Sequence, residues 1–285
     1  MPSYTTLVDT SVLASHIDDP DWVIFDCRND LMNAEAGVAD YASAHIPRAF
    51  FANLDGDLAG DRTGRNGRHP LPNPQLLAEK LGRAGLRSGK QLVAYDAQGG
   101  MFAARLWWLA RWLGHRETAV LDGGWQQWIT ENLPQSNLRP DLRSNEFHEA
   151  PKTIWVDADF VLKNLRDMVL IDARAPDRFR GQNETLDPIG GRIPGARNRF
   201  FKDNLESSGK FKSPHALGEE FSALLADKGV DKAVDKVVHS CGSGVSACHN
   251  LLAMEIAGMP GSRLYPGSWS EWCADANRPI ATGNP

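Results

Sequence analysis

The sequence predicts an α/β protein with two homologous domains in tandem, each a parallel sheet with helices on both faces. Short apolar runs that suit buried strands alternate with longer stretches of helical spacing, which is the pattern of strand–helix–strand units. A series of landmarks also recurs in the same order about 145 residues later. This recurrence indicates that one domain of ordinary size has been duplicated.

The composition is that of an ordinary globular protein. The 285 residues carry a net charge of −5, with 42% hydrophobic and 24% charged residues. The lack of a basic excess argues against a nucleic-acid partner, and no apolar run reaches the roughly 18 residues of a membrane span. We expect a cytoplasmic protein, because the N-terminus lacks the basic and apolar regions of a secretory signal. The four cysteines show no metal-binding spacing, and neither a metal nor an organic cofactor is expected.

The elements of the first half alternate as a parallel sheet requires. A stretch rich in Gly, Asp, Asn and Pro at 55–74 predicts a loop. In chain order, the other predicted elements are a strand at 21–28, a helix at 74–82, a strand at 91–96, a helix at 101–114, and a strand and turn at 119–125.

The second half repeats the landmarks of the first. Asp172 corresponds to Asp26, and Cys241 corresponds to Asp96. The predicted segments are an N-terminal domain at 1–135, a linker at 136–152 and a C-terminal domain at 153–285. Because Asp96 stands where the second half has a cysteine, we expect the N-terminal domain to be catalytically inactive.

Cys241 lies where a short strand, ending at Ser240, meets a loop of small residues that leads into a helix ending near Gly258. The N–H groups of such a loop converge on one point, and the helix N-terminus adds positive potential there. This environment stabilises a negative charge on sulfur, and the thiolate is the nucleophilic form of cysteine. The sequence therefore favours a catalytic Cys241.

Cys241 has two other possible roles, an inert buried residue and the nucleophile of a phosphatase. A buried cysteine is most often an inert apolar residue, but packing alone does not call for a loop rich in glycine. A cysteine phosphatase needs an arginine six residues after the cysteine to bind the phosphate oxygens, and that position is Ala247. The loop therefore argues against phosphate chemistry.

The stretch Cys-Gly-Ser-Gly-Val-Ser-Ala at 241–247 resembles the active-site loop of the two-domain rhodanese family of sulfurtransferases. Within that family, it is most similar to the loop of the 3-mercaptopyruvate sulfurtransferases, whereas thiosulfate enzymes more often carry basic residues in the loop. The tandem repeat extends the resemblance to nearly the whole chain. It implies two rhodanese-like domains and a sulfur carried as a persulfide on Cys241.

The resemblance also implies a set of substrate-binding residues. Arg178 falls on a family arginine that contacts substrate, although Asp177 stands where the family often has glycine. A second substrate arginine is expected nine residues further on, where this chain has Asp187, and Arg192 is a candidate to compensate. A structural role for Arg192 is at least as well supported. The N–H groups of the loop are expected to bind the persulfide: Gly242, Ser243, Gly244, Val245, Ser246 and Ala247.

In the 3-mercaptopyruvate enzymes the loop serine is proposed to work with a histidine and an aspartate. The corresponding residues here are Ser243, His69 and Asp55, which together resemble a triad. We therefore expect a sulfurtransferase that moves sulfur from 3-mercaptopyruvate to a thiol or cyanide. The alternatives are a thiosulfate:cyanide sulfurtransferase and a non-catalytic persulfide carrier or redox sensor.

Overall fold

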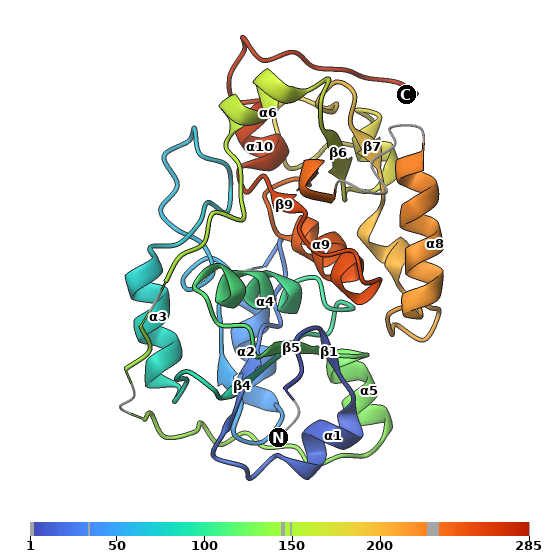
Figure 1. Cartoon of the computed structure of the whole chain (residues 1–285). Coiled ribbons are helices and arrows are strands. Elements are labelled where there is room, and N and C mark those ends of the chain that lie inside the picture. Colours follow the sequence, from blue (N-terminus) through green and yellow to red (C-terminus); the bar gives the residue numbers. More distant parts are fainter. Residues whose placement is uncertain (1–2, 34, 144–145, 149, 227–233, 285) are drawn as a thin grey trace. The chain divides into compact units, whose positions relative to one another are not determined.

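The computed structural model describes residues 3–33, 35–143, 146–148, 150–226 and 234–284 (Figure 1). Its contacts divide the chain into two compact units. Unit 1 comprises Met1–Gly60, Leu71–Lys152 and Ser207–Lys210, and unit 2 comprises Asp61–Pro70, Thr153–Glu206 and Phe211–Pro285. The segment 61–70 thus packs with unit 2, although it lies within the sequence range predicted for the N-terminal domain. The predicted domain boundaries stay a proposal, and residues 144, 145 and 149 of the predicted linker lie outside the described residues.

Unit 1 contains a five-stranded parallel sheet with the strand order β1-β5-β4-β2-β3. The strands are β1 (Leu7–Val8), β2 (Trp22–Asp26), β3 (Phe50–Phe51), β4 (Gln91–Tyr95) and β5 (Thr118–Leu121). The helices are α1 (Thr10–Ser15), α2 (Ala36–Ser43), α3 (Pro74–Arg83), α4 (Ala103–Trp112) and α5 (Gly124–Thr130).

Helices cover both faces of this sheet because successive side chains of a strand point to opposite sides. On one face, Val93 and Tyr95 of β4 pack in a core with Leu13 of α1 and Trp128 of α5. On the other face, α4 lies against β4 and β5. Both faces are therefore apolar, as is typical of strands in a parallel sheet.

Unit 2 contains a four-stranded parallel sheet with the strand order β7-β6-β8-β9. The strands are β6 (Val169–Asp172), β7 (Arg197–Asn198), β8 (Val237–Ser240) and β9 (Arg263–Leu264). The helices are α6 (Ala158–Asn164), α7 (Pro176–Phe179), α8 (Pro214–Leu225), α9 (Ser246–Ile256) and α10 (Ser268–Trp272), with 3-10 turns η1 (Phe201–Asn204) and η4 (Val234–Lys236).

The sheet of unit 2 is also covered on both faces. Leu170 of β6 and Val238 of β8 share a core with Val161 of α6 and Trp272 of α10. On the opposite face α9 lies against β8 and β9, with α8 packed outside it (Figure 1). The carboxyl ends of β6 and β8 lie side by side, and Asp172 pairs in register with Ser240, the residue before Cys241.

The two sheets have the same order of equivalent strands. Trp155 forms a parallel bridge to Leu264 of β9, at the place that β1 takes beside β5 in unit 1. Equivalent strands carry equivalent ion pairs, since Arg28 bonds Asp26 in unit 1 as Arg174 bonds Asp172 in unit 2. The predicted fold class of two homologous α/β domains is confirmed.

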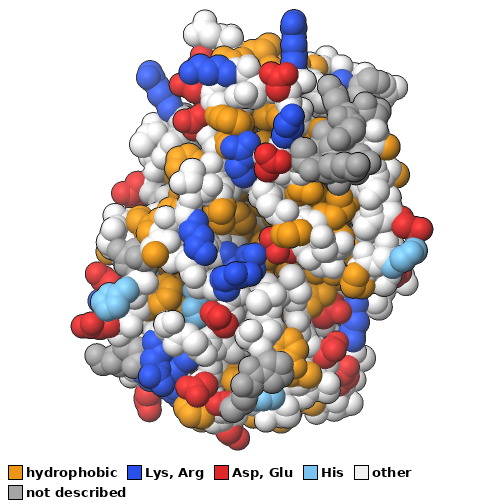
Figure 2. Space-filling view, viewed as in Figure 1, with side chains coloured by type: hydrophobic (Ala, Val, Ile, Leu, Met, Phe, Trp, Pro, Cys, Tyr) orange, Lys and Arg blue, Asp and Glu red, His pale blue; other side chains and the backbone are white. Residues whose placement is uncertain are grey.

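Acidic and basic side chains are interspersed over the face shown in Figure 2. This distribution is expected from 31 basic and 36 acidic residues with a net charge of −5. In the described ranges, no helix combines the length and the apolar composition needed to cross a bilayer.

Candidate active site

The cysteine loop of unit 2 joins β8 to α9, as the sequence predicts. Cys241 follows the last residue of β8 and is only 2% exposed. Its carbonyl oxygen accepts a hydrogen bond from the Trp269 N–H at 3.0 Å, and its own N–H donates to the Ser268 hydroxyl at 3.0 Å. The start of α10 therefore fixes the backbone at the cysteine.

The loop places its N–H groups around the cysteine sulfur. Cys241 Sγ accepts hydrogen bonds from the N–H of Gly244 at 3.1 Å and from that of Ser243 at 3.5 Å. α9 begins two residues after Gly244, so the positive end of its dipole lies close to the sulfur. The arrangement stabilises negative charge on Sγ and on a sulfur atom bound to it.

Gly244 makes this loop possible. Its φ is +77°, and a Cβ at this position would lie 2.3 Å from the carbonyl oxygen of Pro266. Only glycine meets both conditions without strain. The remaining residues of the predicted anion-binding loop follow directly: Val245 precedes the helix, Ser246 is its first residue, and Ala247 is buried.

The equivalent loop of unit 1 surrounds a carboxylate instead of a sulfur. Asp96 accepts hydrogen bonds from the N–H groups of Gln98, Gly100, Phe102 and Ala103 at 2.7 to 2.9 Å. Asp96 is buried, and its contacts with Phe102 and Ala103 lie at the start of α4. Burial raises the pKa of Asp96, and the four N–H groups oppose this.

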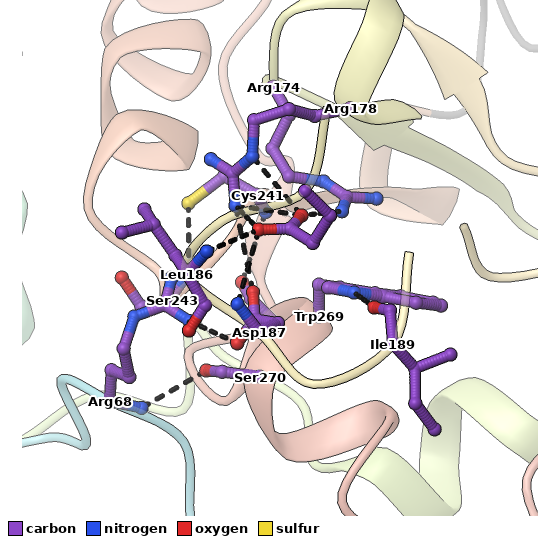
Figure 3. Close-up of polar contacts among 12 residues, drawn as sticks. Arg68, Arg174, Arg178, Leu186, Asp187, Ile189, Cys241, Ser243, Trp269 and Ser270 are labelled. Atoms are coloured by element: carbon purple, nitrogen blue, oxygen red, sulfur yellow. Dashed lines mark hydrogen bonds and ion pairs between the residues drawn. The ribbon is translucent and has the colours of Figure 1, made fainter. Parts of the chain in front are cut away.

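Arg178, predicted to bind substrate, lies on the short helix α7, and its side chain is 21% exposed. Its guanidinium donates to the Glu184 carboxylate at 2.8 to 3.1 Å and lies 3.6 Å from Asp187 Oδ2 (Figure 3). A methyl group built on Gly242 would lie 3.7 Å from Arg178 Nη2. The structure therefore brings Arg178 to the residue that follows Cys241.

Arg68 also reaches this loop, and the sequence reasoning missed it. Its Nη1 forms an ion pair with Asp187, and its Nη2 would lie 2.9 Å from a methyl group on Gly242 (Figure 3). The available signals were its position directly before His69 and an acidic residue at 187, where the family resemblance calls for an arginine.

A third arginine supports the site from the sheet edge. Arg174 bonds Asp172 through Nε and Nη2, donates to the Gly191 carbonyl at 2.7 Å, and lies 4.9 Å from the Trp269 ring. Its Nη1 is 3.7 Å from Glu184. Arg174 thus makes a structural ion pair with Asp172.

The arginines shift the pKa values of two buried carboxylates, Glu184 and Asp187. Burial acts to raise the pKa of Glu184, but its hydrogen bonds, foremost from Arg178, outweigh this and the pKa is lowered. The pKa of Asp187 is raised by burial, with Arg68 opposing and Glu184 adding to the shift. Both side chains are at most 5% exposed, whereas those of Arg68 and Arg178 are more than 20% exposed.

Ser243 and His69 meet in unit 2. The Ser243 Oγ lies 2.7 Å from His69 Nδ1, and both residues are buried. Asp55, proposed as the third member, lies in unit 1 in a turn before the segment 61–70, and its role stays a prediction.

Arg192 makes contacts of a different kind. Its guanidinium donates to the Gly283 carbonyl at 2.6 Å and lies 4.9 Å from the Phe179 ring, while its backbone pairs with Ala281. These contacts lie outside the cysteine loop and favour the structural alternative. In the described part of the chain, no three His, Cys, Asp or Glu side chains form a group able to hold a metal ion.

Comparison with known proteins finds relatives over nearly the whole chain. The model of the rhodanese-like domain matches residues 9–131 and 157–275. A probable 3-mercaptopyruvate sulfurtransferase of Pseudomonas aeruginosa is 45% identical over 287 residues, covering 99% of this chain and 100% of the relative. A putative thiosulfate sulfurtransferase, SseB, of Mycobacterium tuberculosis is 34% identical over 284 residues, covering 97% of each chain. The solved 3-mercaptopyruvate sulfurtransferase of Leishmania major has a TM-score of 0.85 at 27% identity, covering 98% of this chain and 78% of that one.

The chain therefore belongs to the rhodanese family, with two rhodanese-like domains in tandem. It is an enzyme of the sulfurtransferase class.

Proposed function

We propose that this sulfurtransferase takes sulfur from 3-mercaptopyruvate and passes it to a thiol or to cyanide, through a persulfide on Cys241. The observation that carries the proposal is the position of the Cys241 sulfur, which two loop N–H groups and the start of α9 surround. The similarity to 3-mercaptopyruvate sulfurtransferases over nearly the full chain supports the choice of donor.

The first half-reaction follows from this geometry. The Cys241 thiolate attacks the donor sulfur, the bond between that sulfur and C3 of the donor breaks, and its electron pair leaves on the pyruvate enolate. A proton then reaches C3 of the enolate and gives pyruvate. We propose Ser243 as the source of this proton, a role that its 2.7 Å contact with His69 supports.

The second half-reaction returns the enzyme to its starting state. The acceptor, a thiolate or cyanide, attacks the outer sulfur of the persulfide, and the sulfur–sulfur bond breaks with its electrons returning to Cys241. The loop N–H groups that bind Sγ stabilise the persulfide before this transfer. Each half-reaction balances without metal or organic cofactor.

Other cysteines are poorly suited to this role. Burial raises the pKa of Cys273 to about 11, with Asp187 adding to the shift. The pKa of Cys27 is raised well above its usual range by burial and by nearby carboxylates. Both therefore remain thiols at neutral pH, and the thiol is a weak nucleophile.

Steady-state assays with 3-mercaptopyruvate and with thiosulfate, each against cyanide, test the proposal. Cys241→Ser is expected to abolish transfer from both donors, while Cys273→Ser, the control, retains it. After incubation with 3-mercaptopyruvate alone, mass spectrometry should find one added sulfur on the peptide containing Cys241. Retained activity in Cys241→Ser would contradict the mechanism.

Thiosulfate is the second candidate donor, favoured by the similarity to the putative thiosulfate sulfurtransferase of Mycobacterium tuberculosis. A higher kcat/KM for thiosulfate than for 3-mercaptopyruvate would establish it. Activity with neither donor, but transfer of sulfur from a preformed persulfide, would identify a carrier. A reducing compartment such as the cytoplasm would keep Cys241 available for either reaction, and we propose that location.

A further inference from the structure

We propose that Arg68 is the second cation of the donor site and selects a donor that bears a carboxylate. The proposal rests on the proposed function. It gives Arg68 the role of the second substrate arginine, which the family resemblance expects at position 187, where this chain has an aspartate. Four observations support it: where Arg68 lies, what holds it, how the charges around it are arranged and which of its atoms face the loop.

Arg68 and Arg178 lie on the same side of Gly242 in the cysteine loop. A methyl group built on Gly242 would be 2.9 Å from Arg68 Nη2 and 3.7 Å from Arg178 Nη2. The other atom close to that methyl group is Arg178 Nη1, at 3.9 Å. The two guanidinium groups therefore converge on the residue next to the nucleophile.

The backbone of Arg68 is tied to the same loop through Ser270. The Arg68 N–H donates to the Ser270 hydroxyl at 3.0 Å, and the Ser270 N–H donates to the Gly242 carbonyl at 2.9 Å (Figure 3). The segment 61–70 passes close by at a second point, since a Cβ on Gly67 would lie 2.7 Å from the Gly267 carbonyl oxygen. Arg68 is thus held as a part of the site and is not a loosely placed surface residue.

In the ion pair between Arg68 and Asp187, the cation is the more exposed partner. Asp187 is 3% exposed and Arg68 is 24% exposed, and their ion pair uses Arg68 Nη1. Nη1 also lies 3.5 Å from the Leu186 carbonyl, which leaves Nη2 as the guanidinium atom nearest the loop. Asp187 therefore acts as a positioning residue that orients Arg68.

This geometry suits a carboxylate in the donor. A guanidinium presents two parallel N–H groups that match the two oxygens of a carboxylate, and two such groups side by side can bind both of its edges. Arg178 and Arg68 together would then bind the carboxylate of an α-keto acid donor, with its sulfur directed to Cys241. Arg68 would contribute more to donor binding than to the chemical steps.

Binding of pyruvate tests the proposal without depending on sulfur transfer. Isothermal titration of pyruvate into Cys241→Ser protein would be compared with the same protein carrying Arg68→Ala, Arg68→Lys or Arg65→Ala. Arg65 lies on the same segment and is exposed, so it is the matched control. We expect Arg68→Ala to raise the Kd at least about tenfold, Arg68→Lys to raise it less, and Arg65→Ala to leave it unchanged.

Kinetics on the protein with Cys241 intact supply a second measurement. Arg68→Ala should raise the KM for 3-mercaptopyruvate at least about tenfold while kcat changes less than threefold. Replacing Arg68 by Asp and Asp187 by Arg together should recover part of the binding that Arg68→Asp alone loses.

The outcomes separate the two proposals. Pyruvate binding that depends on Arg68, in a protein that transfers no sulfur from 3-mercaptopyruvate, would retain the anion site and reject the proposed function. Equal pyruvate binding with and without Arg68, in a correctly folded protein, would overturn the role of Arg68 whatever the activity. Undetectable pyruvate binding in the Cys241→Ser parent would overturn it as well.

Discussion

The hydroxyl of Ser243 lies 2.7 Å from Nδ1 of His69, a residue 174 positions away in the sequence. Both side chains are buried in unit 2, on two segments that meet at the cysteine loop. A hydroxyl with this contact is suited to passing a proton between a histidine and a group bound at the sulfur. The pair therefore gives the first prediction.

Ser243→Ala and His69→Gln should each lower kcat for 3-mercaptopyruvate by about 10²-fold, because each removes one end of the proton path. The double variant should be little worse than either single variant, since the two residues act as a unit. The measurement is a double-mutant cycle on kcat. Additive losses would show that the two side chains act independently.

Gly244→Ala should disturb the cysteine loop, because a Cβ there meets the Pro266 carbonyl and the residue needs a positive φ. We expect kcat to fall at least about tenfold as the N–H of residue 244 moves away from the sulfur. Gly258, beyond the other end of α9, is the matched control: its φ is +74°, and nothing lies within 4 Å of a Cβ.

Gly258→Ala should therefore show the cost of the backbone conformation alone, about 1 kcal/mol of unfolding free energy, with activity retained. Urea unfolding and steady-state assays on both variants make the comparison. Equal activity in the two would mean that the loop tolerates the clash.

Asp96→Ala should destabilise unit 1, because it leaves four N–H groups of a buried loop without their acceptor. A loss of about 3 kcal/mol in unfolding free energy is expected, and Asp96→Asn should lose less because one acceptor oxygen remains. Asp18→Ala is the control, since that side chain is 95% exposed. Similar unfolding curves for Asp96→Ala and Asp18→Ala would contradict the assigned role of the carboxylate.

His239 in β8 predicts a loss of stability in acid. Burial disfavours its charged form and lowers its pKa to about 3, and its Nε2 lies 3.2 Å from Met254 Sδ. In the unfolded chain the pKa is about 6.5, so below that pH the unfolded state binds a proton that the folded state does not. The free energy of unfolding therefore falls as the pH drops from about 6.5 toward 3, by about 2 kcal/mol at pH 5.

His239→Leu should remove this part of the acid sensitivity. Urea unfolding at pH 7.5 and pH 5 would measure the difference for the wild type, for His239→Leu and for His215→Gln, whose side chain in the wild type is 81% exposed. The His215 variant should behave as the wild type does. An unchanged pH dependence in His239→Leu would show that other groups account for it.

Much of the fold follows from local patterns. The apolar run before Cys241, the small residues after it and the helix ending near Gly258 are all adjacent in sequence, and they appear as β8, the loop and α9. The internal repeat supplied a second, independent argument, because a strand predicted in one half of the sequence must have an equivalent strand in the other half. For these reasons the strand–loop–helix arrangement at Cys241 was predictable.

The surroundings of Cys241 were harder to predict, because they come from distant segments. Arg68 and Asp187 are 119 residues apart, and no periodicity or spacing links them. His69 was proposed only through the family resemblance. An aspartate at position 187, where the family resemblance calls for an arginine, suggests that another arginine takes over that role. Finding this arginine requires the three-dimensional contacts.

Arg192 illustrates the opposite difficulty. Its position in the sequence made it a candidate to replace the missing second substrate arginine. In the structure, its guanidinium instead donates to the Gly283 carbonyl and lies over the Phe179 ring. A long charged side chain reaches several neighbours from one backbone position, and sequence alone does not choose among them.

The carboxylate of Asp96 occupies, in unit 1, the ring of N–H groups that in unit 2 faces a sulfur. We therefore expect the two domains together to carry no more sulfur atoms than one domain would. A sample that has been fully converted to the persulfide should release one equivalent of labile sulfur per polypeptide when titrated with cyanide. We therefore predict that each polypeptide holds one transferable sulfur at a time, because the equivalent loop of unit 1 is occupied by the Asp96 carboxylate.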